Sequence, residues 1–442
     1  MPQEIHTYTH TNGFRHVYQR VRTTEPTVYI YLYCNVGSAM EPPNLRGVSH
    51  FVEHMCFKGT PSHPKARDFL HIFDSTGCYF NGYTSKRSTL YYIKCHANDL
   101  AHLLFALSDG VLNSVFVPGE YKKELKVVTE EMIRAMDNNN LKAKTYSDQM
   151  VYAGTPFERP VDSYDYHTDP DSDLASRKKV IEFYKKWYCP QNMILSVSGN
   201  LSYKDFVHSL GQSHFLRGSR IEGNLSLSNL YIRPIPSTGP EYNITSLDIP
   251  KTSYVSISFR TCDYNSTDKY VLDFLSELFS SYFSSKLTSM LRQENGLTYT
   301  SQTTTAYYEC GGDFTIFAVS DVDKLVSTPG VIPIIISLLN ETKAKGVTTN
   351  ELRLTKMYLQ RSRELGIMTD ECAAHNGEWL LMHPNGEDII PYQNVYDDFF
   401  ANITSAQIKR VAQKYFVAEN MTVCVMGKGV NKASIIRACS KI

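Results

Sequence analysis

Apolar and polar positions along the chain alternate between the spacing of strands and that of amphipathic helices, and one such pattern occurs twice. Residues 180–199, VIEFYKKWYCPQNMILSVSG, align with residues 408–427, IKRVAQKYFVAENMTVCVMG. Each copy predicts an amphipathic helix that leads into a buried strand ending at glycine. A similar match relates VYIYLYCNVGS, which begins at Val28, to YVSISFRTCD at Tyr254. The repeats predict two homologous domains.

The join between these domains is expected where the periodicity lapses. A chain of 442 residues is too long for one ordinary core, and residues 217–247 are rich in Gly, Ser, Asn and Pro, as linkers are. We therefore predict a first domain over residues 1–216 and a second over residues 248–442. In the first, strand-like runs such as residues 27–36 are interleaved with helical ones such as residues 47–57, without strict βαβ alternation. The predicted fold class is α+β, with a mixed, largely antiparallel sheet packed with helices in each domain.

Charge and hydropathy narrow the classes of partner. The chain has 45 basic and 45 acidic residues and a pI near 7.2, so we expect neither nucleic acid nor an anionic membrane as a partner. The longest apolar runs, such as residues 331–339, are shorter than the roughly 20 residues that cross a bilayer. The N-terminal stretch lacks the composition of a secretory signal or a mitochondrial presequence. A cytoplasmic location is expected, with the ten scattered cysteines reduced.

The segment GVSHFVEHMCFKGT carries the most specific chemical signal in the chain. If it is helical, His50 and His54 project from one face and can bind the same Zn²⁺, while Glu53 lies beside the metal. This is the inverted H-x-x-E-H arrangement of zinc peptidases. By composition it would arise by chance on the order of 0.02 times in such a chain. The alternative is an ordinary helix with two partly exposed histidines and a solvated glutamate.

A zinc site that keeps one position for water needs a third protein ligand. The best source is the predicted helix KKELKVVTEEMIRAM, in which Glu124 and Glu131 lie two turns apart on one face. From the residues alone, these glutamates are as well explained by an exposed, solvated helix face.

At these residues the chain resembles the pitrilysin family of inverted-motif zinc peptidases, in the branch that includes the mitochondrial processing peptidase β-subunit and its bacterial relatives. The resemblance extends over nearly the whole chain. Its landmarks are NVGSAMEPPNLRGVSHFVEHMCFKGT, FNGYTSKRSTLYY, YKKELKVVTEEM, GTPFERPV, YKKWYCPQNMILSVSGN and LRQENGLTYT.

The resemblance assigns a role to each candidate residue. It implies that His50, His54 and Glu131 bind one zinc ion per chain, with Glu53 as the general base and Glu124 as a supporting acid. Two sets of substrate contacts are also implied: Asn81 and its strand would hold the peptide backbone, and Arg292 and Tyr299 would reach the substrate from the second domain.

The implied activity is that of a zinc metalloendopeptidase acting on peptides or unfolded protein segments. In the family, two domains form a half-shell and two half-shells close a chamber, which implies a dimer with itself or with a paralogue. The second half of the chain has no H-x-x-E-H, so only the first domain is expected to be catalytic. The alternatives are a catalytically silent structural homologue, a peptide-binding module and, more weakly, a nucleotide enzyme, since MGKGV lacks the full P-loop spacing.

Overall fold

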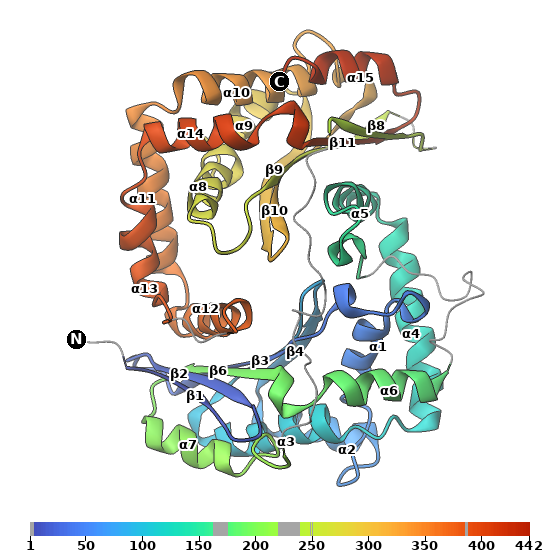
Figure 1. The fold of residues 1–442 in the computed structure, drawn as a ribbon, viewed down its shortest axis with the longest axis vertical. Coiled ribbons are helices and arrows are strands. Elements are labelled where there is room, and N and C mark those ends of the chain that lie inside the picture. Colours follow the sequence, from blue (N-terminus) through green and yellow to red (C-terminus); the bar gives the residue numbers. More distant parts are fainter. Residues whose placement is uncertain (1–3, 162–175, 220–238, 248, 250, 385–387) are drawn as a thin grey trace. The chain divides into compact units, whose positions relative to one another are not determined.

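The computed structural model describes residues 4–161, 176–219, 239–247, 249, 251–384 and 388–442. The chain divides into two compact units, each built from separate stretches of sequence (Figure 1). The first comprises Met1–Ala135, Arg159–Tyr231 and Gly366–Gln393, and the second comprises Met136–Glu158, Ile232–Leu365 and Asn394–Ile442.

The first unit is organised around a six-stranded sheet in the order β1-β2-β6-β3-β5-β4. Neighbouring strands are antiparallel, except for the parallel pair β2 and β6. Its strands are β1 (Ile5–Thr9), β2 (Arg15–Arg20), β3 (Thr27–Cys34), β4 (Tyr79–Thr84), β5 (Thr89–His96) and β6 (Met193–Gly199). The short strand β4 ends the sheet, so one side of its backbone pairs with β5 and the other lies at the edge.

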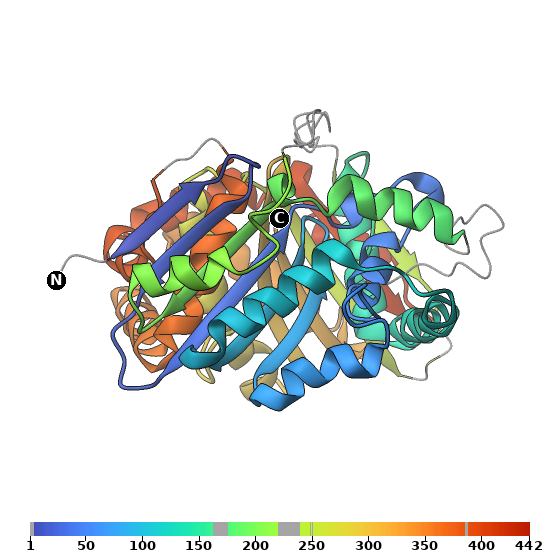
Figure 2. The same ribbon diagram turned by 90° about the horizontal axis from the view of Figure 1, so that it is seen from below.

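The helices of the first unit lie on both faces of this sheet (Figures 1 and 2). They are α1 (Val48–Met55), α2 (Ala66–Thr76), α3 (Leu100–Asn113), α4 (Pro118–Asp137), α6 (Arg177–Trp187), α7 (Tyr203–Gly211) and α12 (Met368–Met382). One face carries α12, and the opposite face carries α3 and α7. Most strand residues at the centre of the sheet are fully buried between these layers.

Helix α12 comes from the second half of the sequence but packs on β3 and β6 of the first unit. Small residues let it approach closely: a Cβ on Gly377 would lie 2.2 Å from the Tyr33 ring. Polar contacts fix it at both ends, where Tyr31 donates to Asp370 at 2.6 Å and Arg15 donates to the Leu380 carbonyl at 3.0 Å. The C-terminal carbonyls of a helix carry partial negative charge, which favours a cation such as Arg15.

The second unit repeats this plan with a five-stranded sheet in the order β7-β11-β8-β10-β9. The pair β7 and β11 is parallel and the other pairs are antiparallel. Its strands are β7 (Glu241–Thr245), β8 (Thr252–Thr261), β9 (Thr298–Tyr308), β10 (Gly311–Asp321) and β11 (Met421–Gly427). Its helices are α5 (Asn139–Val151), α8 (Asp268–Ser280), α9 (Lys286–Thr288), α10 (Val331–Lys345), α11 (Thr349–Leu365), α14 (Ser405–Tyr415) and α15 (Lys432–Cys439). The short helix α13 (Tyr392–Val395) crosses the boundary between the two units.

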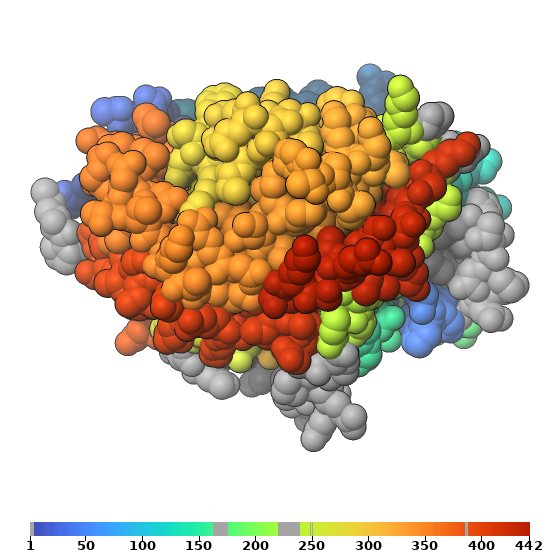
Figure 3. All heavy atoms as spheres, turned by 90° about the horizontal axis from the view of Figure 1, so that it is seen from above, coloured from blue at the N-terminus to red at the C-terminus, as the bar shows by residue number. Residues whose placement is uncertain are grey.

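Helix α5 is the counterpart of α12, because it comes from the first half of the sequence and packs on β8 and β11 of the second unit. Ser147 and Ser258 share a buried hydrogen bond of 2.7 Å, and Arg260 donates to the Val151 carbonyl at 3.1 Å. Helices α10, α14 and α15 pack together in the second unit, and their residues lie on the face that Figure 3 shows.

These observations confirm the predicted α+β class and the internal repeat. The order β2-β6-β3-β5-β4 matches β7-β11-β8-β10-β9, including the parallel pair. The compact units differ from the predicted domains 1–216 and 248–442, because α5 and α12 each belong to the unit of the other half. Most of the predicted linker, residues 217–247, lies outside the described residues, but its end forms the strand β7.

Among the described residues, no single helix is long and apolar enough to span a bilayer. One pair, Ala97–Asn113 and Pro118–Asp137, has the required length and composition only when both helices are taken together across a bend of 91°.

The close packing of α12 generates a stability prediction. Gly377→Val places a branched side chain against the Tyr33 ring, so it is expected to lower the free energy of unfolding by about 1–3 kcal/mol. Glu371→Val, at an exposed position of the same helix, is the control for a branched residue in α12. Thermal and urea unfolding measure both variants, and equal effects would contradict the close packing.

Candidate metal centre

Helix α1 is held in place by its apolar face. Phe51, Val52 and Met55 are fully buried, whereas His50, Glu53 and His54 are only partly buried. The spacing of 3.6 residues per turn therefore directs the two histidines away from the core and toward α4.

The N-terminus of α1 is held by a buried carboxylate. Glu41 accepts the backbone N–H groups of Gly47 and Ser49, each at 2.8 Å. These donors have no partner within the helix, and a side-chain carboxylate both satisfies them and matches the helix dipole. Gly47, with φ of 80°, is in the left-handed conformation that glycine adopts without strain. Burial raises the pKa of Glu41 to about 7, although its two N–H donors oppose the rise.

Three candidate ligands converge beside α1. The Nε2 atoms of His50 and His54 lie 3.1 Å apart. An oxygen of Glu131, on α4, lies 3.8 Å from His50 Nε2 and 3.5 Å from His54 Nε2. One donor atom from each residue falls within 4.8 Å of the others. Zinc–nitrogen and zinc–oxygen bonds of about 2.0–2.2 Å place tetrahedral ligand atoms at such separations, so the donor set fits zinc.

Burial and hydrogen bonding affect the pKa values of the two histidines in opposite directions. Burial, followed by the charge of His54, lowers the pKa of His50 to about 4, so its imidazole is neutral near pH 7. His54 Nδ1 lies 2.8 Å from Glu124 Oε1. In the neutral tautomer that donates its Nδ1–H to this carboxylate, Nε2 carries the lone pair and faces the other candidate ligands. Burial disfavours the charged forms of both His54 and Glu124. The hydrogen bond between them nevertheless raises the pKa of His54. The same bond, together with Lys58, lowers the pKa of Glu124.

The candidate base, Glu53, is held against the edge strand β4. Thr84, at the end of β4, donates its hydroxyl to Glu53 Oε2 at 2.5 Å. A Cβ on Gly82 would lie only 2.6 Å from the other carboxylate oxygen of Glu53. Glycine and threonine at these alternate positions of β4 therefore leave room for the Glu53 carboxylate and orient it.

Asn81 precedes Gly82 on β4 and is exposed, on the opposite face of the strand from Gly82 and Thr84. Its side-chain oxygen accepts the Gly82 N–H at 2.9 Å, which fixes the amide beside the strand. The predicted contact of Asn81 with a peptide backbone stays a prediction.

Arg292 and Tyr299 belong to the second unit, whereas the candidate metal ligands belong to the first. Arg292 is exposed on a π-helical segment, Ser289–Gln293. Tyr299 is 63% exposed, and its hydroxyl donates to Asp321 at 3.2 Å. Their predicted reach to the substrate therefore also stays a prediction.

Sequence reasoning missed three residues that the structure places around the centre: Glu41, Lys58 and Thr84. Each is recognisable only from its tertiary contact. Thr84 is 31 positions from Glu53 in the sequence, and nothing in the pattern of β4 distinguishes its hydroxyl from that of any other strand threonine.

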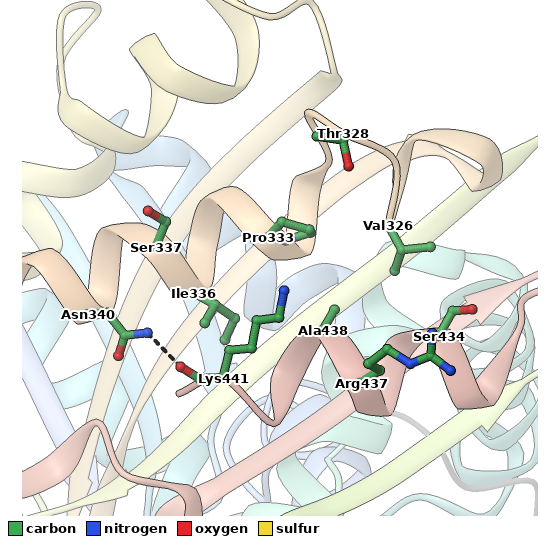
Figure 4. Close-up of a pocket in the computed structure, with 10 residues that line it drawn as sticks. All are labelled: Val326, Thr328, Pro333, Ile336, Ser337, Asn340, Ser434, Arg437, Ala438 and Lys441. Carbon is green, nitrogen blue, oxygen red and sulfur yellow. Dashed lines mark hydrogen bonds between the residues drawn. The ribbon is translucent and has the colours of Figure 1, made fainter.

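A surface cavity of about 570 Å³ in the second unit contains none of the predicted site residues (Figure 4). It lies between α10 and α15, where Asn340 donates to the Lys441 carbonyl at 2.6 Å. Its lining residues are Val326, Thr328, Pro333, Ile336, Ser337, Asn340, Ser434, Arg437, Ala438 and Lys441.

Comparison with known families gives the class that this geometry suggests. Residues 17–161 match the model "Insulinase (Peptidase family M16)", and residues 175–359 match "Peptidase M16 inactive domain". The chain belongs to peptidase family M16, the pitrilysin family of the sequence analysis.

The chain is similar to several curated relatives, two of them along most of its length. It is 28% identical over 408 residues to an "uncharacterized zinc protease" of Rickettsia bellii, covering 91% of this chain and 92% of that protein. An "uncharacterized zinc protease" of Bacillus subtilis is 26% identical over 419 residues, covering 92% and 94%. Subunit 1 of the bovine mitochondrial cytochrome b-c1 complex is 27% identical over 206 residues, covering 46% and 41%.

Solved structures show the same fold at low sequence identity. A Helicobacter pylori protease superimposes with a TM-score of 0.85 at 20% identity, covering 96% of this chain and 99% of that one. A Pseudomonas fluorescens structure of an M16 inactive domain gives a TM-score of 0.80 at 17% identity, covering 97% and 98%.

The buried cap on α1 generates a second prediction. Glu41→Ala leaves two N–H groups without their acceptor, so it is expected to lower the free energy of unfolding by about 1–3 kcal/mol. Because the folded-state pKa of Glu41 is raised from 4.5 to about 7, its contribution is largest at low pH. The difference from wild type is therefore expected to narrow as the pH rises from about 4.5 to about 7, and to stay constant above that range.

The control for this substitution is Glu158→Ala, which removes an exposed glutamate that accepts the Gly154 N–H at 2.9 Å. Urea unfolding over a range of pH compares the two variants. A loss for Glu41→Ala no larger than for Glu158→Ala would rule out the capping role.

Proposed function

We propose that this chain is a zinc-dependent endopeptidase that hydrolyses peptides or unfolded protein segments. The observation that carries the proposal is the convergence of His50, His54 and Glu131 within 4.8 Å. This is the donor set of a catalytic site with three protein ligands, which keeps a further position for water or substrate. The M16 relatives named as zinc proteases support the same function.

Each residue of the centre has a defined task in this proposal. When bound, zinc supplies a Lewis acid and lowers the pKa of water toward about 7. His50, His54 and Glu131 hold the ion. Glu53, oriented by Thr84, accepts the proton of the attacking water and passes it to the leaving amine. Glu124 supports the centre by holding His54 in one tautomer and orientation.

The position of β4 at the edge of the sheet favours a peptide as the proposed substrate. This strand ends the sheet beside Glu53, and an extended peptide adds to such an edge through backbone hydrogen bonds. The proposal also includes a dimer, with a second copy or a paralogue, that closes a chamber in the cytoplasm. The dimer and its chamber depend on the family resemblance alone, and the cytoplasmic location stays the expectation stated above.

The competing function is that of a catalytically silent structural or peptide-binding homologue. The similarity to subunit 1 of the bovine mitochondrial cytochrome b-c1 complex, a component of a larger assembly, favours the structural form of this alternative. The joint presence of all three ligands and of an oriented base favours the enzyme, because a purely structural subunit has no need of this combination.

Separate tasks for base and ligand give a third prediction. Glu53→Gln keeps the shape of the side chain but cannot take up a proton, so zinc content is expected to stay near one per chain while turnover falls about 10²–10⁴-fold. Glu131→Gln is expected to lose most of the bound zinc, because a neutral amide is a poor ligand. Elemental analysis and cleavage of a quenched fluorescent peptide measure the two quantities.

Glu130→Gln is the matched control, because Glu130 adjoins Glu131 on α4 but pairs with Arg134 at 3.8 Å and is 69% exposed. It is expected to behave as wild type in both measurements. A wild-type chain without zinc after reconstitution overturns the proposal, and so does near-normal hydrolysis by Glu53→Gln.

The predicted role of the second unit gives a fourth test. If Arg292 and Tyr299 orient the peptide and stabilise the oxyanion, Arg292→Ala and Tyr299→Phe lower turnover and leave zinc content unchanged. Loss of one oxyanion donor typically costs about 10²–10³-fold in kcat. Arg353→Ala and Tyr358→Phe, which alter other arginine and tyrosine side chains of the same unit, are the controls. Full activity in Arg292→Ala and Tyr299→Phe would exclude these residues from the site.

A further inference from the structure

A lysine that the proposed mechanism does not use lies directly behind the metal centre. Lys58 follows α1 in the turn Cys56–Gly59, and its Nζ lies 2.8 Å from Glu124 Oε2. The other oxygen of the same carboxylate, Oε1, accepts His54 Nδ1–H at 2.8 Å. The side chains therefore form a chain of contacts from His54 through Glu124 to Lys58.

The backbone around Lys58 is fixed by the fold. Its N–H donates to the Met55 carbonyl at 3.2 Å, and the Val115 N–H donates to the Gly59 carbonyl at 3.2 Å. Gly59 has φ of 123°, and a Cβ at that position would lie 2.8 Å from the Pro64 carbonyl oxygen. Only glycine fits this turn without strain, so the start of the Lys58 side chain is set by packing.

Burial makes the Lys58–Glu124 pair different from a surface ion pair. The Glu124 side chain is 8% exposed and that of Lys58 is 25% exposed. Removing one partner of such a pair leaves a buried charge without compensation, which is costly. The pair Lys123–Glu120, on α4 itself, has the same 2.8 Å separation, but Lys123 is 72% exposed. Exposed pairs of that kind contribute little.

We propose that Lys58 is a positioning residue of the metal centre, acting through Glu124 on His54. With Oε2 held by the ammonium, the carboxylate cannot rotate away, and Oε1 stays directed at the His54 ring. The ring is then held with Nε2 toward Glu131 before the metal arrives. The inference depends on the proposed zinc function, because it assigns Lys58 to the metal affinity of that site.

Mutating the group that hydrogen-bonds to the second ring nitrogen of a metal-binding histidine typically lowers metal affinity by about 10–100-fold. Lys58→Met keeps an unbranched side chain of similar length but removes the charge. Because its effect passes through Glu124, zinc binding is expected to weaken by up to about the 10–100-fold caused by losing Glu124 itself. Lys58→Arg restores a cation and is expected to recover most of the affinity. Lys123→Met is the matched control and is expected to bind zinc as wild type does.

Three measurements test the proposal on the full chain. Competition with a chromogenic chelator gives the zinc affinity, the visible absorption of the Co²⁺-substituted chain reports the coordination geometry, and thermal unfolding of the metal-free chain reports the fold. In a Glu124→Gln background, Lys58→Met is expected to cause little further loss of affinity, because its effect passes through Glu124. Lys58→Gln replaces Lys58→Met if the latter does not fold.

The proposal is overturned if Lys58→Met binds zinc within about twofold of wild type, well below the expected range. It is also overturned if Lys123→Met loses as much affinity, if Lys58→Arg recovers none, or if the losses in Lys58→Met and Glu124→Gln are additive. If the wild-type chain binds zinc but hydrolyses no peptide, the proposed peptidase activity is wrong and the proposed role of Lys58 is unaffected. A wild-type chain that binds no zinc refutes both.

Discussion

The burial of one face of α1 is the constraint on which the metal centre depends. Phe51, Val52 and Met55 have no exposed surface, and fully burying such side chains stabilises by about 1.5–3 kcal/mol each. With that face fixed, the rotation of the helix is fixed, and His50 and His54 project on the opposite side. The ligands are thus brought together by apolar packing, which does not itself require the metal. Contacts at both ends of α1, from Glu41 and from the turn at Gly59, prevent the helix from sliding along its axis.

A second constraint acts on the sheet that carries β4. Its central strands are buried on both faces, so two layers of helix must cover them. The helix on one face, α12, comes from the far end of the sequence, and Arg15 and Arg87 bind the Leu380 and Leu381 carbonyls at its C-terminus. Since α5 makes the reverse contribution, neither half of the sequence supplies all the helices that cover its own sheet.

Much of this arrangement could be predicted from the sequence, and the remainder has a physical explanation. The repeat at residues 180–199 and 408–427 predicted two matching sheets, because helix and strand periodicity are local properties. The spacing of His50 and His54 predicted a shared metal, because a helix fixes the direction of side chains four apart. The exchange of α5 and α12 could not be predicted, since an apolar helix face does not specify which sheet it covers. The roles of Lys58 and Thr84 could not be predicted for a related reason. Each depends on contact with a carboxylate that is distant in the sequence, Glu124 for Lys58 and Glu53 for Thr84.

The position of β4 has a consequence for which polypeptides the chain would accept. A strand edge offers backbone N–H and C=O groups, and every residue except proline presents the complementary groups. If β4 receives the substrate, recognition there selects by conformation more than by sequence. In a segment that belongs to a native sheet or helix, the backbone N–H and C=O groups are already hydrogen-bonded and cannot pair with the edge. In an unfolded segment these groups are available. The six residues of β4, which include Thr84 and so orient Glu53, would then also discriminate unfolded polypeptides from folded ones.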